Sequence, residues 1–147
     1  MKNSVIALIN DFVQKNGESK LIELLAVKKH VGVLTIISNA GIHPYHGLHM
    51  RGEVFFASKG TLDFSTPESA VSEIEAALLR VAKKLKEKRW NQVYLVPFGP
   101  APLSLQIKSL VKKVLDIETI DVLHIGNGVH IDISINPRSI AANISDE

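Results

Sequence analysis

Residues 92–115, QVYLVPFGPAPLSLQIKSLVKKVL, join two segments of different periodicity through one tight turn. The first segment, Gln92–Phe98, is short, uncharged and rich in β-branched and aromatic side chains, which predicts a strand buried on both faces of a sheet. The second segment, Leu103–Leu115, repeats apolar residues at the spacing of a helix. Because a buried strand that leads directly into a helix is typical of parallel α/β sheets, we expect that fold class.

Further strands are predicted on both sides of this stretch. Val31–Ser38 and Ile120–Ile125 are short, mostly apolar runs, as buried strands are. Between them, Glu53–Ala57 and Thr61–Phe64 are expected to form two short strands that are joined around residues 58–60.

Helices are predicted before and between these strands. The clearest one begins with the capping-box pattern of Ser65 and Glu68 and ends near Arg89, where several lysines suit the helix dipole. Ser4–Lys15 carries apolar residues at helical spacing and is predicted to be a helix. Ser19–Lys29 is either a helix or a buried strand, and its charged residues favour the helix.

The end of the sequence predicts a hairpin and a tail. Asn127 and the glycines beside it tolerate positive φ angles, so residues 126–128 are expected to form the turn. In Val129–Ile135, aliphatic residues alternate with polar ones, which predicts an antiparallel strand with one exposed face. The polar residues after Pro137 are expected to be loose.

Together these elements predict an α/β fold of Rossmann-like architecture. We expect a mostly parallel sheet with helices on both faces and an antiparallel C-terminal hairpin. Residues 31–147 would form this domain. Residues 1–30 would supply N-terminal helices that pack on it or extend it.

Composition limits the classes of function. The 147 residues are 46% hydrophobic and 22% charged, which suits a globular domain and argues against a disordered or fibrous chain. Without cysteine there is no disulfide framework, zinc ribbon or thiol nucleophile. A net charge of +2 and 5% aromatic residues argue against a long nucleic acid as partner. No signal peptide or membrane span is apparent, so we expect a cytoplasmic protein without a membrane partner.

Ligands of open α/β sheets bind beyond the carboxyl ends of the parallel strands. Two predicted loops reach that edge, residues 38–52 and residues 98–104. In the second loop, the N–H groups of Leu103, Ser104 and Leu105 and the Ser104 hydroxyl could bind an anion at the start of the helix. An equally simple interpretation is a short connection without a ligand. Neither GxGxxG nor a P-loop pattern is present, so no cofactor is expected.

The loop after the first strand contains three histidines, His43, His46 and His49, at the spacing HxxHxxH. A proline and a glycine between them disfavour a regular helix, so we do not expect a metal site. Together with Arg51, the histidines could bind phosphate, and a histidine could act as a general acid or base.

The run QVYLVPFGPAPLSLQIKSLVKKVL, the strand IDVLHI and the final strand VHIDISI resemble the SAVED domain and its CARF relatives. The strand and loop VGVLTIISNAG, placed before a long helix, are similar to the first block of such modules, and the resemblance covers roughly residues 31–135. These families read cyclic oligonucleotide second messengers in bacterial antiviral defence, in CBASS and type III CRISPR systems.

By position, the resemblance implies ligand contacts in two places. After the first strand they are Ser38, Asn39 and Gly41, and in the turn they are Phe98, Gly99, Pro100, Ala101 and Ser104. From chemistry alone we add His43, His46 and Arg51 as ligand-binding residues, and His43, His46, His49 and Arg51 as catalytic candidates.

A SAVED domain contains two fused CARF-like halves, whereas this chain has the length of one. The resemblance therefore implies a homodimer or larger homo-oligomer that rebuilds a two-half pocket, and a separate effector protein as a further partner. The leading hypothesis is a sensor module that binds a cyclic oligonucleotide or a related nucleotide. One alternative is a metal-independent ring nuclease, in which the ribose 2′-OH attacks the adjacent phosphate. The other is a ligand-free scaffold that binds a partner through the exposed face of the long helix or through the apolar segment Ser4–Lys29. That segment could also form the dimer contact.

Overall fold

The computed structural model describes residues 2–22, 32–41 and 50–144. The chain divides into two compact units, Met1–Val31 and Gly32–Glu147. In the first unit, α1 spans Lys2–Asn16, which confirms the first predicted helix. Residues 18–22 are also helical, and the rest of the predicted segment 19–29 lies outside the described residues.

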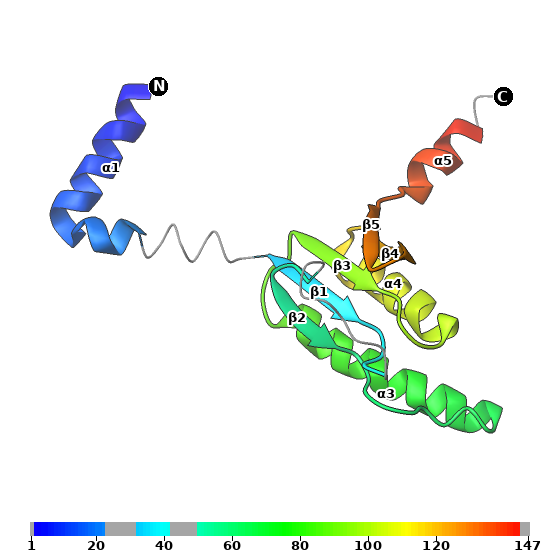
Figure 1. Ribbon diagram of the computed structural model, residues 1–147. Helices are drawn as coiled ribbons and strands as arrows, with labels where there is room; N and C mark the ends of the chain where they lie inside the picture. Colours follow the sequence, from blue (N-terminus) through cyan, green and yellow to red (C-terminus); the bar gives the residue numbers. More distant parts are fainter. Residues whose placement is uncertain (1, 23–31, 42–49, 145–147) are drawn as a thin grey trace. The chain divides into compact units, whose positions relative to one another are not determined.

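Five strands of the second unit form one sheet in the order β2-β1-β3-β4-β5 (Figure 1). β1 pairs in parallel with β2 and β3, and β3 pairs in parallel with β4, whereas β5 is antiparallel to β4. This confirms the predicted α/β fold with its mostly parallel sheet and C-terminal hairpin. The strands are β1 Val33–Ile37, β2 Glu53–Phe56, β3 Gln92–Val96, β4 Ile120–Gly126 and β5 Val129–Ile133.

Two long helices connect the parallel strands. α3 (Pro67–Lys86) follows β2, and α4 (Ala101–Leu115) follows β3. The helices contact each other and cover the same face of the sheet (Figure 1). This main core buries Leu34, Ile36, Val93 and Leu95 from the strands and Ala77, Val81, Leu85, Leu103, Ile107 and Val111 from the helices.

The opposite face of the sheet carries a smaller apolar cluster. Ile37, Val96 and Val122 are buried there, and partly buried side chains pack around them, among them Tyr94 and Phe98. In the described residues, both strand-connecting helices lie on the other face, although the sequence predicted helices on both.

Three local predictions were wrong. Thr61–Phe64 forms no strand and lies in the connection between β2 and α3. α3 is capped by Thr66 and Ser69, which exchange hydrogen bonds of 3.1 Å between backbone and side chain. Ser65, the predicted cap, instead binds the carboxylate of Asp63. The tail is not loose, since α5 spans Pro137–Ile144.

Ion pairs join the start of β2 to the end of α3. The Glu53 carboxylate pairs with the ammonium groups of Lys84 and, at 2.8 Å, Lys88. Lys84 also pairs with Glu87 at 2.6 Å, and its side chain is only 11% exposed. The hydrogen bonds from Lys84 and Lys88 lower the pKa of Glu53. The carboxylate form of Glu53 therefore stabilises this corner of the fold.

Replacement of Glu53 by glutamine should weaken the fold more at neutral pH than in acid. Because the folded-state pKa of Glu53 is lowered, its contribution is present above the unfolded pKa of a glutamate and is lost as the pH falls through the folded pKa. We expect Glu53→Gln to lower the free energy of unfolding by about 0.5–1 kcal/mol at pH 7. The difference from the parent should shrink between pH 7 and pH 3, as measured by urea denaturation. Glu75→Gln, on an exposed part of α3, is the matched control and should change little at either pH.

Candidate functional site

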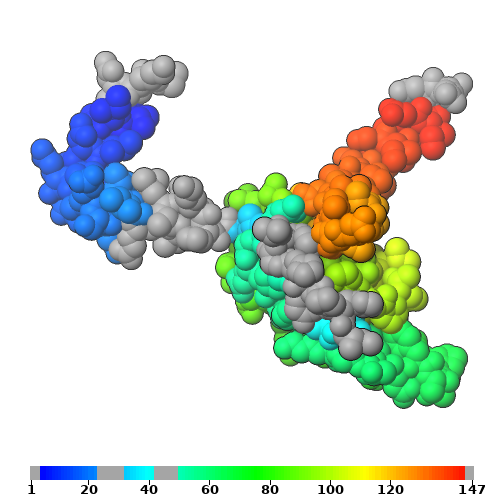
Figure 2. Space-filling view, in the orientation of Figure 1, coloured from blue at the N-terminus to red at the C-terminus, as the bar shows by residue number. Residues whose placement is uncertain are grey.

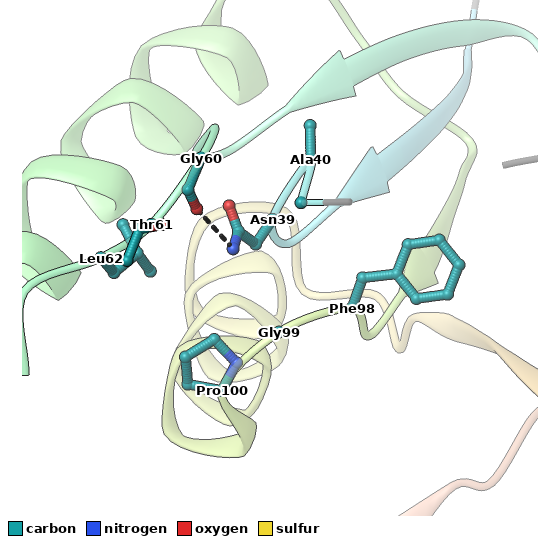
Figure 3. Close-up of a pocket in the computed structure, with 9 residues that line it drawn as sticks. Asn39, Ala40, Gly60, Thr61, Leu62, Phe98, Gly99 and Pro100 are labelled. Carbon is teal, nitrogen blue, oxygen red and sulfur yellow. Dashed lines mark hydrogen bonds between the residues drawn. The ribbon is translucent and has the colours of Figure 1, made fainter. Parts of the chain in front are cut away.

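A pocket of about 600 Å³ opens at the carboxyl ends of β1, β2 and β3. Three connections line it, namely residues 39–41 after β1, residues 60–62 after β2 and residues 98–100 before α4 (Figure 3). The chain leaves β1 for β2 on one side, while β3 lies on the other side of β1. Such a switch point is where open α/β sheets bind ligands, and the volume is within the range of small-molecule sites.

The turn between β3 and α4 approaches the end of β1 very closely. Gly99 has a φ of +83°, a conformation that favours glycine. A Cβ atom added there would lie 2.8 Å from the Cβ of Asn39, which is too close for a real contact. This position therefore requires glycine for two reasons, its backbone conformation and the space available.

The start of α4 offers fewer donors than the sequence predicted. The helix begins at Ala101, so Ser104 and Leu105 lie within its first turns. The N–H of Leu103 donates to the carbonyl of Pro100 at 3.1 Å. Among the described residues, the N–H groups of Gly99 and Ala101 have no hydrogen-bond partner. These two amides, rather than the three predicted ones, are the donors that a ligand could use here.

Buried hydroxyl groups lie directly beneath the pocket. The Oγ atoms of Ser38 and Ser104 are 2.8 Å apart, and Ser38 also donates to the carbonyl of Val96 at 3.2 Å. Either hydroxyl can be the donor of the bond between them, since each serine has one rotatable O–H. This bond ties the end of β1 to the first turn of α4.

Asn39 and Ser58 extend the same network toward the loop after β2. Ser58 donates to the carbonyl of Ser38 at 2.8 Å and lies 3.1 Å from the Oδ1 of Asn39. The Asn39 amide donates to the carbonyl of Gly60 at 3.1 Å (Figure 3). The three connections that line the pocket are thus held together by side chains that bond within the protein.

Several of the residues predicted to bind a ligand meet at this pocket. Asn39, Gly41, Phe98, Gly99 and Pro100 line it. Ser38 and Ser104 are buried beneath it, and Ala101 follows as the first residue of α4. Figure 3 shows the ring of Phe98 turned away from Gly60 and Thr61, so Phe98 borders the pocket chiefly through its backbone.

The lining also includes residues that the sequence analysis missed, namely Ala40, Gly60, Thr61 and Leu62. Gly60, Thr61 and Leu62 were missed because Glu53–Ala57 and Thr61–Phe64 were expected to form two short strands joined around residues 58–60. A parallel β2 instead brings its following loop to the same edge as the loop after β1. The strand-like pattern of β2 followed by a helix is the signal that could have indicated this arrangement.

Arg51 is not brought to the pocket. It precedes β2 and so lies toward the amino-terminal edge of the parallel strands, whereas the pocket is at the carboxyl edge. Its backbone binds the hydroxyl of Thr35, with distances of 2.7 and 2.8 Å. Its guanidinium lies 2.8 Å from Asp132, which raises the pKa of Arg51, and 4.4 Å from the ring centre of Tyr94. His43, His46 and His49 lie outside the described residues.

Comparisons with protein-family models, curated proteins and solved structures found no match for this chain. Within residues 2–22, 32–41 and 50–144, no group of three or more histidine, cysteine, aspartate or glutamate residues could hold a metal ion. No helix in those ranges is both long enough and apolar enough to cross a bilayer. The function therefore has to be inferred from the pocket itself.

Substitution of Gly99 should show how tightly the pocket is built. Gly99→Ala adds strain at a positive φ and a contact with Asn39, so we expect a loss of stability. Gly126 has a φ of +103° but nothing within 4 Å of an added Cβ, so Gly126→Ala adds strain alone. In urea denaturation, Gly126→Ala should cost about 1–2 kcal/mol, and Gly99→Ala about 1–3 kcal/mol more. Equal losses would show that the turn can move away from β1.

Proposed function

We propose that this pocket binds a nucleotide of the cyclic-oligonucleotide class and that the chain is a sensor module for such a messenger. The observation that carries the proposal is the position of the pocket at the β1/β3 switch point, beside the first residues of α4. Phosphate groups bind readily at the amino-terminal ends of helices. The resemblance to SAVED and CARF sequences supports a cyclic oligonucleotide over other phosphate esters. A separate effector protein would then receive the signal.

The lining suits a ligand that is held by backbone and neutral groups. None of the nine described lining residues carries a charge. The amides of Gly99 and Ala101 would bind phosphate oxygens, and the Thr61 hydroxyl would bind a ribose or a base edge. Leu62 and Pro100 supply apolar surface for the flat face of a base. Selectivity would therefore depend on shape and hydrogen bonding more than on charge pairing.

Calorimetry of the full chain against cyclic di-, tri- and tetranucleotides tests the proposal directly. We expect heat with at least one ring and an unchanged ligand when the mixture is separated by chromatography. Linear products would change the assignment to a ring nuclease. No heat and no product with any ring would refute the proposed function.

A charge introduced at Gly41 should report whether the ligand is anionic. Gly41 lines the pocket, and among the described residues an added Cβ would meet only the Asn39 amide, at 3.9 Å. Gly41→Asp and Gly41→Asn add side chains of the same shape that differ by one charge. We expect the aspartate variant to bind the ring about tenfold more weakly than the asparagine variant at low salt. If the two variants have equal affinity, the phosphates lie elsewhere.

A further inference from the structure

The aliphatic face of the β4–β5 hairpin is exposed. β4 pairs with β3 only at Ile120 and Asp121, so the rest of the hairpin extends beyond the parallel strands. Figure 2 shows the hairpin, in orange, at the surface of the second unit. Five large aliphatic residues in and just after it are 42–55% exposed, namely Leu123, Ile125, Val129, Ile131 and Ile135. A cluster of this kind on a strand marks a surface that another chain covers.

The backbone of β5 offers a way to recruit that chain. Among the described strands, β5 is the last in the sheet order, so one of its edges faces no other strand. Exposed edge strands are usually protected by lysine, proline or a bulge. The five residues of β5, VHIDI, contain neither lysine nor proline, and the register shift of the hairpin, between His124 and Gly126, lies in β4. A second strand could therefore continue the sheet at this edge.

The sequence of β5 is complementary to itself. In an antiparallel pair centred on Ile131, Val129 lies opposite Ile133 of the second copy, and His130 lies opposite Asp132. All five residues are then paired, with aliphatic side chains together on one face and His130 with Asp132 on the other. Centring on His130 or on Asp132 would pair only three residues and would set identical polar side chains opposite each other.

Asp132 can accept this additional contact. Arg51 binds its Oδ1 atom, which leaves Oδ2 for a donor from another chain. The side chain of Asp132 is 39% exposed. His130 of the second copy would therefore donate a hydrogen bond to a carboxylate that Arg51 already binds.

From these observations we propose that the chain forms a homodimer by antiparallel pairing of β5 with β5 of a second copy, about a two-fold axis at Ile131. The two sheets would join into one continuous sheet of ten strands. The exposed aliphatic residues of the two hairpins would meet across this axis.

This dimer has a consequence for ligand stoichiometry. A two-fold axis perpendicular to the sheet reverses the direction of every strand in the second copy. The two pockets would then open at opposite edges of the continuous sheet, because each lies at the carboxyl ends of its own parallel strands. Each chain would bind its own ligand, in contrast to the shared two-half pocket that the resemblance implies. The experiments can therefore refute the proposed dimer and leave the proposed ligand binding in place, or the reverse.

Single cysteines can test the register, because the parent chain contains none. Opposed residues in an antiparallel pair have Cα atoms about 4.5–5.5 Å apart, within the range of a disulfide. Ile131→Cys should therefore form a disulfide-linked dimer of the full chain under mild oxidation. His130→Cys should not, since its opposite residue is Asp132. Cross-linking of His130→Cys in place of Ile131→Cys would overturn the register.

Charge substitutions test the surface in solution, with the molar mass measured by sedimentation. Ile131→Lys sets two ammonium groups opposite each other and should weaken the dimer by at least about tenfold. Leu79→Lys, at a residue of α3 that is 64% exposed, is the matched control and should leave the dimer intact. His130→Glu should weaken it by repulsion from Asp132, whereas His130→Lys should not. A monomeric parent chain, or a dimer unaffected by Ile131→Lys and His130→Glu, would refute the proposal.

Discussion

The hydrogen bond between the buried hydroxyls of Ser38 and Ser104 holds the end of β1 against the first turn of α4. Both serines are buried, and separating them would remove a side-chain hydrogen bond of Ser104 in the core. The bond places the turn before α4 so close to β1 that only glycine fits at position 99. The pocket above is a direct result of this arrangement. Much of its lining is backbone and small residues, while the side chains of Ser38, Ser58 and Asn39 hold the connections together.

Burial explains which parts of the fold could be predicted. Strands covered on both faces need continuous apolar residues, and β1 and β3 were predicted for that reason. Thr61–Phe64 has a similar short pattern, but Leu62 packs against the main core from a connection and not from a strand. Capping depends on single hydrogen bonds, and the choice of Thr66 over Ser65 follows from a bond to Asp63 that the pattern does not specify.

The residues of the candidate site could be predicted from the sequence only where the sequence also predicted the order and direction of the strands. Strand ends followed by helices place Asn39 and Gly99 at one edge, whatever the details of the loops. The direction of β2 decides whether Thr61 joins them, and periodicity does not distinguish a parallel neighbour from a hairpin. The same uncertainty applies to Arg51, which precedes β2, does not line the pocket and instead has its guanidinium beside Asp132 and over Tyr94. Distance along the chain does not show at which end of a strand a residue will lie.

In β5, aliphatic residues alternate with polar ones, and this pattern concerns contacts between chains as well as the fold. The pattern correctly predicted an antiparallel strand, but the expectation of a single exposed face was wrong, because Val129 and Ile131 on the aliphatic face are exposed as well. An aliphatic face is normally assumed to pack within its own chain. Here residues such as Ile131 remain exposed because α4 ends its contact with the hairpin near Asp121, to which Lys108 is paired. An alternating pattern therefore specifies that a face should be buried but not which chain buries it. The residues of β5 match those of a second β5 that runs antiparallel to it. Pairing of two copies is therefore the simplest way to bury the aliphatic face.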